Sequence, residues 1–187
     1  MSNTAPRPDS TEASPNPHPA FELISPGGFV NAGAHVPDLV VYLHGFRSSP
    51  SSVKAQKVIA VFEEAGWSDR LWVPQLPASP AEAIDLVLQG IEGRLPEEGG
   101  KLTVLGSSLG GFYATVLGER FPRAQVVLMN PSVKPYDDLE DQIGKKKVYF
   151  SDEEIDFVPA YLQELRDMEH TSLTAPERYL LIAAQGD

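Results

Sequence analysis

The stretch Leu102-Thr103-Val104-Leu105-Gly106-Ser107-Ser108-Leu109-Gly110 decides how this chain folds, because an apolar run leads directly into a Gly-x-Ser-x-Gly motif. Only Ser108 has a glycine two residues before it and another two residues after it. Between a strand and a helix, such a motif forms a tight turn that projects the serine hydroxyl above the sheet. The hydroxyl then lies at a helix N-terminus, where free N–H groups favour developing negative charge. We interpret Ser108 as a candidate nucleophile, with a purely structural turn as the alternative.

Strands and helices alternate on both sides of this motif. Apolar runs typical of buried strands lie at residues 39–43, 71–73, 102–105, 125–129 and 179–184. Apolar residues at helical spacing predict one helix that ends at Gly66 and others over 80–95, 109–120 and about 160–169. The alternation predicts an α/β fold with a parallel sheet covered on both faces by helices. We interpret Lys145-Lys146-Lys147 and Asp152-Glu153-Glu154 as solvated charge runs.

The composition is that of an ordinary globular protein, and 187 residues fit one domain with or without a tail. A net charge of −11 argues against a partner held through a phosphate backbone, so we expect no nucleic-acid partner. The absence of cysteine excludes disulfides, thiolate metal sites and a cysteine nucleophile. No apolar run approaches the roughly 18 residues that cross a bilayer, and the N-terminus has no signal-peptide pattern. We expect a soluble, cytoplasmic protein with no membrane partner.

The N-terminal part differs in composition from the rest of the chain. Its apolar content is too low to offset the entropy of ordering it. We expect residues 1–37 to be a disordered or loosely docked extension and residues 38–187 to form the domain. A proline-rich ligand for a partner domain is the functional alternative for the extension. Seven of the 17 prolines lie in this part, at Pro6, Pro8, Pro15, Pro17, Pro19, Pro26 and Pro37.

A second candidate feature is His44-Gly45-Phe46, directly after the first buried strand. In an acyl-transfer enzyme, this loop donates a backbone N–H to the oxyanion beside the N–H of the residue after the nucleophile. This assigns the oxyanion hole to the main-chain N–H groups of Phe46 and Leu109. His44 as the catalytic base is the alternative, although its place at the end of the first strand is where an oxyanion loop belongs.

A third candidate is Asp187, just after the last predicted strand. A carboxylate there can hold a histidine in the correct tautomer and stabilise its protonated form. A frayed terminal aspartate is the alternative. Asp137, Asp138 and Asp156 are weaker candidates for the acid.

The general base is harder to place, because the order in this architecture is nucleophile, acid and then histidine. No residue follows Asp187, while His18 and His35 lie in the N-terminal extension. His170 precedes the last predicted strand. It is either a substitute base or a surface histidine near a helix end.

Several motifs in the same order resemble the YqiA/YcfP-type esterases of the α/β-hydrolase superfamily. The resemblance covers residues 39–187. It is carried by Tyr42-Leu43-His44-Gly45-Phe46 with Ser48-Ser49-Pro50-Ser51-Ser52 and Lys54-Ala55, by Gly106 to Thr115, by Asn130-Pro131-Ser132-Val133-Lys134-Pro135-Tyr136, and by Ala175-Pro176 with Gln185-Gly186-Asp187.

The resemblance implies a three-layer αβα sandwich with a mostly parallel sheet, the α/β-hydrolase fold, here C-terminally incomplete. It also implies a serine esterase for short acyl esters or thioesters, with no cofactor and no metal. Ser108 falls on the family's nucleophile position and Asp187 on its acid. The family continues past the acid into a Gly-x-x-His-type loop and a final helix. We therefore expect the 187-residue form to lack its base and to be nearly inactive.

Three hypotheses follow. In the first, the protein is a carboxylic-ester hydrolase whose partner is a small ester or thioester. In the second, it is a non-catalytic binding or interaction protein of the same fold. In the third, His170 is the base of an intact enzyme. The residues leave the oligomeric state, the acyl-chain length and the leaving group open.

Overall fold

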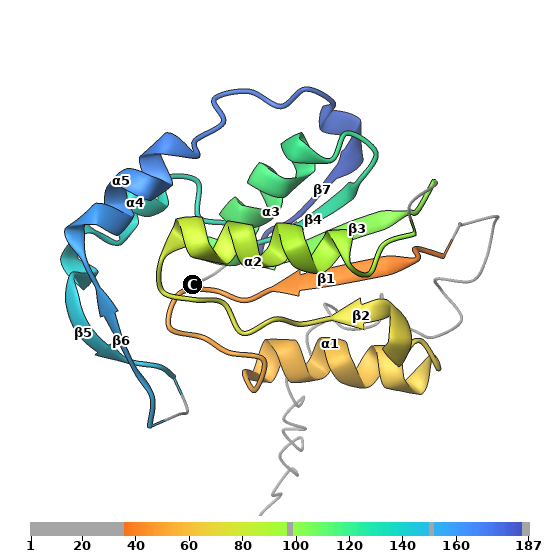
Figure 1. The fold of residues 1–187 in the computed structure, drawn as a ribbon, viewed down its shortest axis with the longest axis horizontal. Coiled ribbons are helices and arrows are strands. Elements are labelled where there is room, and N and C mark those ends of the chain that lie inside the picture. The colour runs from red at the N-terminus through yellow and green to blue at the C-terminus, as the bar shows by residue number, and fades with distance from the viewer. Residues whose placement is uncertain (1–35, 97–98, 150–151, 185–187) are drawn as a thin grey trace, which may run out of the picture. The chain divides into compact units, whose positions relative to one another are not determined.

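The computed structural model describes residues 36–96, 99–149 and 152–184, and its central element is a parallel β-sheet (Figure 1). The expectations for residues 1–35 and for Asp187 lie outside the described residues. Neighbouring strands all run parallel, so their carboxyl ends meet at one edge of the sheet. The strand order is β2 (Leu71–Trp72), β1 (Leu39–Leu43), β3 (Leu102–Ser107), β4 (Gln125–Met129) and β7 (Tyr179–Ile182).

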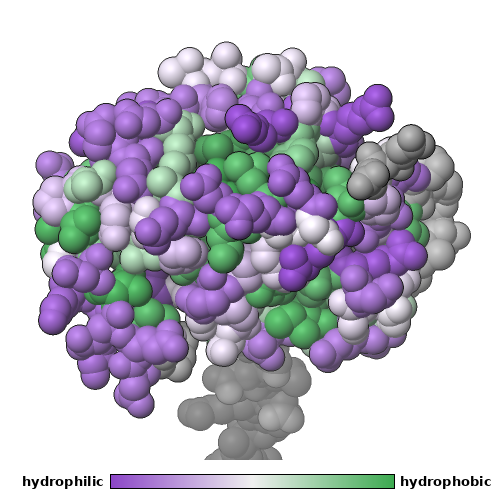
Figure 2. Space-filling model, viewed as in Figure 1, coloured by the Kyte–Doolittle hydropathy of each residue, from purple (hydrophilic) through white to green (hydrophobic). Residues whose placement is uncertain are grey.

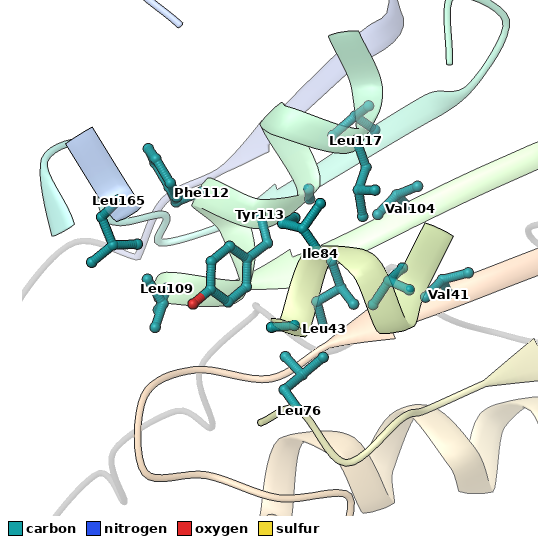
Figure 3. Close-up of a cluster of buried hydrophobic side chains, with 14 of the residues drawn as sticks. Val41, Leu43, Leu76, Ile84, Val104, Leu109, Phe112, Tyr113, Leu117 and Leu165 are labelled. Carbon is teal, nitrogen blue, oxygen red and sulfur yellow. The ribbon is translucent and has the colours of Figure 1, made fainter. Parts of the chain in front are cut away.

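One face of the sheet is covered by α2 (Pro80–Glu92) and α3 (Leu109–Arg120). Val41 and Val104, which pair across β1 and β3, are fully buried beneath these helices (Figure 3). Ser79 caps α2, since its side chain accepts a hydrogen bond from the Glu82 N–H at 3.2 Å. Burial of such side chains contributes about 1.5–3 kcal/mol each and is the main force that fixes the sheet.

The opposite face is covered at one end by α1 (Val53–Glu64), from which the Lys54 Nζ donates to the Ser107 Oγ at 3.5 Å. Over β7 this face is open. Leu180 is 57% exposed and Ile182 is 49% exposed, and no helix in the described ranges covers them. The face that Figure 2 shows is largely hydrophilic, with scattered apolar residues.

The predicted fold class is confirmed: a parallel sheet of five strands is flanked by helices. All five predicted strands begin at the observed residues, at 39, 71, 102, 125 and 179. The helix expected over 160–169 is α5 (Pro159–Asp167). Among the described helices, none combines the length and the apolar character that a bilayer crossing needs.

The runs Lys145-Lys146-Lys147 and Asp152-Glu153-Glu154 were interpreted as solvated, which is only partly correct. Residues of both runs belong to a β-hairpin. Strand β5 (Gly144–Lys147) pairs antiparallel with β6 (Glu154–Phe157). Lys145 lies opposite Asp156 and Lys147 opposite Glu154, so unlike charges face each other across the strands. The lysines at 145 and 147 are solvated, as expected, but the strand itself was missed. Short elements complete the described chain: α4 (Pro135–Asp138) and 3₁₀ turns at Ser68–Arg70, Glu140–Gln142 and Pro176–Arg178.

Candidate active site

Ser108 occupies a strained turn between β3 and α3. Its φ is 54° and its ψ is −120°, a conformation that costs a residue with a side chain about 1–3 kcal/mol. Backbone hydrogen bonds hold the turn, including one from the Phe112 N–H to the Ser108 carbonyl at 3.4 Å. The Ser108 N–H donates to the Met129 carbonyl at 3.2 Å, and the Ser108 carbonyl accepts from the N–H groups of Gly111 at 2.8 Å and Ser132 at 3.1 Å. The turn therefore presents Ser108 as an exposed residue at the start of α3.

The turn requires glycine at both motif positions, Gly106 and Gly110, because other parts of the backbone lie very close to them. A Cβ at Gly106 would lie 2.0 Å from the Gly110 carbonyl oxygen. A Cβ at Gly110 would lie 2.1 Å from the Leu43 carbonyl oxygen. Real Cβ atoms do not come this close to backbone, so no side chain fits at either position. The sharp turn at Ser108 is possible only because both positions lack one.

The loop after β1 lies against this serine. A Cβ at Gly45 would be 3.2 Å from the Ser108 Cβ and 3.6 Å from its Oγ. In the described part of the chain, the N–H groups of Phe46 and Leu109 have no hydrogen-bond partner. The Leu109 N–H is the first of α3, where the helix dipole adds to its positive character. These are the two groups that the sequence predicted for an oxyanion hole, and both line the same cavity.

His44 uses both of its ring nitrogens within the fold. Nε2 accepts a hydrogen bond from the Leu76 N–H at 3.2 Å, which leaves Nδ1 to donate to the Gly45 carbonyl at 3.0 Å. The ring is 4% exposed, and burial lowers the pKa of His44 below its ordinary value. His44 thus joins the loop after β1 to the segment before α2, and neither nitrogen is free to accept a proton from Ser108.

A cavity of about 30 Å³ opens beside the Phe46 and Leu109 N–H groups. Its walls come from four segments that are far apart in the sequence: the loop after β1, the segment before α2, the start of α3, and the β5–β6 hairpin. The lining residues are His44, Gly45, Phe46, Arg47, Ser48, Gln75, Leu76, Pro77, Ala78, Leu109, Tyr113, Val148 and Ile155.

Arg47 joins the loop after β1 to the β5–β6 hairpin, a contact that the sequence did not predict. The Arg47 carbonyl accepts from the Tyr149 N–H at 2.7 Å, and its Nε donates to the Lys147 carbonyl at 2.7 Å. Its guanidinium lies over the Tyr149 ring at 4.4 Å. Beside it, the rings of Phe46 and Phe157 meet edge to face at 5.0 Å. The hairpin is therefore attached to the loop that carries the predicted oxyanion donor.

The end of β7 is attached to the end of β4 through Asn130. The Asn130 N–H donates to the Ile182 carbonyl at 2.9 Å, and its Oδ1 accepts from the Ala184 N–H at 2.8 Å. Asn130 has a φ of 42°, which places its side chain in the turn after β4. Asp187 itself lies outside the described residues, but Ala184 is held next to the segment that carries Ser132, whose N–H contacts Ser108.

The remaining candidates for acid and base make other contacts. Asp138 accepts from the Ser132 hydroxyl at 2.5 Å, Asp137 is exposed on α4, and Asp156 faces Lys145 across the hairpin. Exposed His170 follows α5 and lines a second cavity of about 120 Å³ with Phe112, Thr115 and others. Within the described ranges, no histidine is hydrogen-bonded to Ser108, and no three histidine or carboxylate side chains gather as a metal site.

A buried polar cluster anchors the start of β7 to the end of α3. The Arg178 guanidinium donates to the carbonyls of Gly118 at 3.0 Å and Ala124 at 2.9 Å. The Tyr179 hydroxyl donates to Glu119, whose side chain is 5% exposed. This hydrogen bond lowers the pKa of the Glu119 carboxyl, with a further contribution from Arg178. The cluster fixes where β7 begins, and so where the chain leaves the sheet.

Comparison with known proteins agrees with this geometry. The model of an uncharacterised protein family, UPF0227, matches residues 39–187. Among solved structures, alpha/beta hydrolase domain-containing protein 10 from mouse is 15% identical, with a TM-score of 0.54 over 77% of this chain and 67% of that one. A structure described as the metagenome-derived lipolytic enzymes LipS and LipT is 18% identical, with a TM-score of 0.51 over 80% of this chain and 73% of that one. These likenesses show that residues 39–187 adopt the α/β-hydrolase fold.

Proposed function

Because the chain belongs to the family UPF0227, as its resemblance to the YqiA/YcfP-type proteins predicted, we propose that it is a serine hydrolase of short carboxylic esters or thioesters. One observation carries the proposal. Exposed Ser108 lies at the start of α3 in a strained turn, directly against Gly45 and next to two unpartnered backbone N–H groups, those of Phe46 and Leu109. Since one fold hosts many reactions, the proposal rests on this site rather than on the fold.

In the proposed reaction, the Ser108 Oγ attacks the carbonyl carbon of the ester, and its proton passes to a general base. The carbonyl oxygen becomes an oxyanion that accepts hydrogen bonds from the Phe46 and Leu109 N–H groups. The bond to the leaving alcohol or thiol then breaks, which leaves an acyl group on Ser108, and water hydrolyses this acyl-enzyme. Losing one oxyanion donor typically costs about 2.7–4 kcal/mol of transition-state stabilisation.

As the family resemblance implies, the base is a histidine in the family's Gly-x-x-His-type loop after the acid, which Asp187 would orient; residues 1–187 do not include this loop. His44 is unsuited to it, because the Leu76 N–H occupies Nε2 and the Gly45 carbonyl occupies Nδ1. His44 instead positions the loop that carries Phe46. His170 has no contact with Ser108 that would serve proton transfer.

The cavity supports a short acyl chain. Its volume of about 30 Å³ is close to the space of one or two water molecules, which leaves room for only a few carbon atoms. Apolar side chains, among them Leu76, Pro77 and Val148, form much of its lining. Val148 and Ile155 of the β5–β6 hairpin line this cavity, and Arg47 attaches the hairpin to the loop after β1.

A non-catalytic binding protein of the same fold is the second candidate. The observation that favours it is that no histidine within the described residues is hydrogen-bonded to Ser108. It predicts that the cavity binds a small ligand without any covalent step at the serine.

Hydrolysis of p-nitrophenyl butyrate distinguishes the two. The proposal predicts that residues 1–187 alone are nearly inactive. A form extended through the histidine loop should show turnover that disappears in Ser108→Ala and persists in Ser132→Ala, a matched loss of a nearby hydroxyl. Turnover that is equal in the extended form and in its Ser108→Ala variant would contradict the proposal and favour the binding protein.

A further inference from the structure

Tyr113 carries a hydroxyl for which the described residues supply no hydrogen-bond partner. The residue as a whole is 3% exposed. Figure 3 shows the ring extending from α3 with the hydroxyl oxygen at its far end, on the side of Leu109. Both residues line the 30 Å³ cavity, and the hydroxyl end of the ring lies on the Leu109 side.

The surroundings keep this hydroxyl protonated. Burial raises the pKa of Tyr113 far above its ordinary value, and the negative charge of Glu164 raises it further. Glu164 itself is occupied, since it accepts from the Ser79 hydroxyl at 2.8 Å and from the Ala81 N–H at 2.9 Å. Tyr113 therefore stays a neutral hydrogen-bond donor around neutral pH.

The rest of the lining offers little that could satisfy this donor. Leu76, Pro77, Ala78, Val148 and Ile155 contribute apolar side chains. His44 uses both of its nitrogens elsewhere. The other polar side chains of the lining belong to Arg47, Ser48 and Gln75, which are half-buried or exposed.

We propose that Tyr113 determines substrate specificity by donating a hydrogen bond to an oxygen atom on the acyl chain, such as the hydroxyl of a 3-hydroxyacyl group. This inference rests on the proposed function. If the Phe46 and Leu109 N–H groups hold the carbonyl oxygen, the first carbons of the acyl chain lie at the mouth of the cavity that these two residues line. The cavity is small, so an oxygen that meets Tyr113 belongs to one of these first carbons.

A substrate without an oxygen atom on its acyl chain binds at an energetic cost. A plain alkyl chain that fills the cavity would displace water and leave the Tyr113 hydroxyl buried without a partner. A site with a dedicated hydrogen-bonding group discriminates against such an analogue more strongly than an apolar pocket discriminates between chain lengths. The inferred site therefore favours the oxygenated acyl group.

Binding tests the inference without requiring turnover. The dissociation constants of ethyl 3-hydroxybutyrate and ethyl butyrate are measured by NMR titration in Ser108→Ala and in Ser108→Ala/Tyr113→Phe. We expect the hydroxy ester to bind about tenfold more tightly than the plain ester when Tyr113 is present. In the double variant, the ratio of the two constants falls to about one. Thermal unfolding of both variants checks that the phenylalanine ring at position 113 packs as the tyrosine ring does.

Two results would overturn the inference. One is a preference for the hydroxy ester that survives Tyr113→Phe. The other is no preference when Tyr113 is present, including the case in which neither ester binds and the hydroxyl serves only a water molecule. Failure of the proposed function is seen separately, as hydrolysis that does not depend on Ser108, because the binding ratio is measured in chains that lack this serine.

Discussion

The Cα of Gly45 faces Ser108 so closely that a Cβ on Gly45 would lie 3.2 Å from the Ser108 Cβ and 3.6 Å from its Oγ. The loop after β1 and the turn after β3 thus come together without an intervening side chain. This contact puts the Phe46 N–H within the same small cavity as the Leu109 N–H. It is the geometric basis for assigning an oxyanion site to these two groups.

Gly45→Ala should lower the rate of ester hydrolysis. A methyl group at this contact pushes the loop away from Ser108 by a few tenths of an ångström, and with it the Phe46 N–H. In the form extended through the histidine loop, we expect kcat/KM for p-nitrophenyl butyrate to fall about 10–100-fold, since small displacements of catalytic groups are costly. Gly93→Ala is the matched control, because a Cβ there meets only the Gln89 carbonyl at an ordinary 3.4 Å. Equal rates for the two variants would argue against the assigned oxyanion loop.

Arg47→Gln should loosen the β5–β6 hairpin. The change removes the Nε donor to the Lys147 carbonyl and the cation over the Tyr149 ring, while the backbone bond to Tyr149 remains. We expect limited proteolysis within residues 144–157 to become several-fold faster, because opening of this segment becomes less costly. Arg123→Gln, the same change at an exposed arginine outside the hairpin, should leave the rate unchanged. A hairpin that is equally resistant in both variants would show that Arg47 does not hold it.

His44 should make the protein less stable in mild acid. Its pKa is lowered by burial in the folded state, so the unfolded chain binds more protons below about pH 6.5. The free energy of unfolding therefore falls as the pH drops from about 6.5 through the lower folded-state pKa, and it is unaffected by this group above that range. Protonation of Nε2 also breaks its bond from the Leu76 N–H.

Urea unfolding at pH 7.5 and 5.5 measures this effect. The loss of stability between the two values should shrink in His44→Asn and remain in His170→Ala, which removes an exposed imidazole. An identical loss in the chain and in His44→Asn would contradict the role given to His44.

Tyr179→Phe should destabilise the fold through Glu119. The change removes a hydroxyl that donates to a carboxylate only 5% exposed, and hydrogen bonds to charged groups contribute about 1.5–3 kcal/mol. We expect the free energy of unfolding to fall by about this amount. Tyr149→Phe, at a side chain that is 52% exposed, should change it by less than about 0.5 kcal/mol. Similar values for the two variants would mean that the anchor of β7 is not energetically important.

Much of the sheet could be predicted because its signals are local. The run at residues 39–43 is buried along its whole length, as a continuous apolar strand requires, and the Ser79 cap marks the start of α2. The β5–β6 hairpin could not be predicted in this way. Its alternation is hidden in a run of lysines, and the charges that support it come from a second strand, so only the pairing reveals it.

The residues of the site also divide into those that a local sequence motif predicts and those that it does not. Ser108 and Gly45 are each recognisable from a short motif, and the sheet brings their segments together. The roles of Arg47 and Tyr113 depend on contacts with distant segments, and neither residue has a local signal.

The nucleophilic role of Ser108 is tested most directly by covalent labelling with diisopropyl fluorophosphate. The Oγ displaces fluoride and forms a bond to phosphorus, and peptide mass spectrometry locates the adduct. In the form extended through the histidine loop, we expect a single adduct on the peptide that contains Ser108, absent in Ser108→Ala and retained in Ser132→Ala. An adduct on another residue, or labelling that persists in Ser108→Ala, would contradict the account.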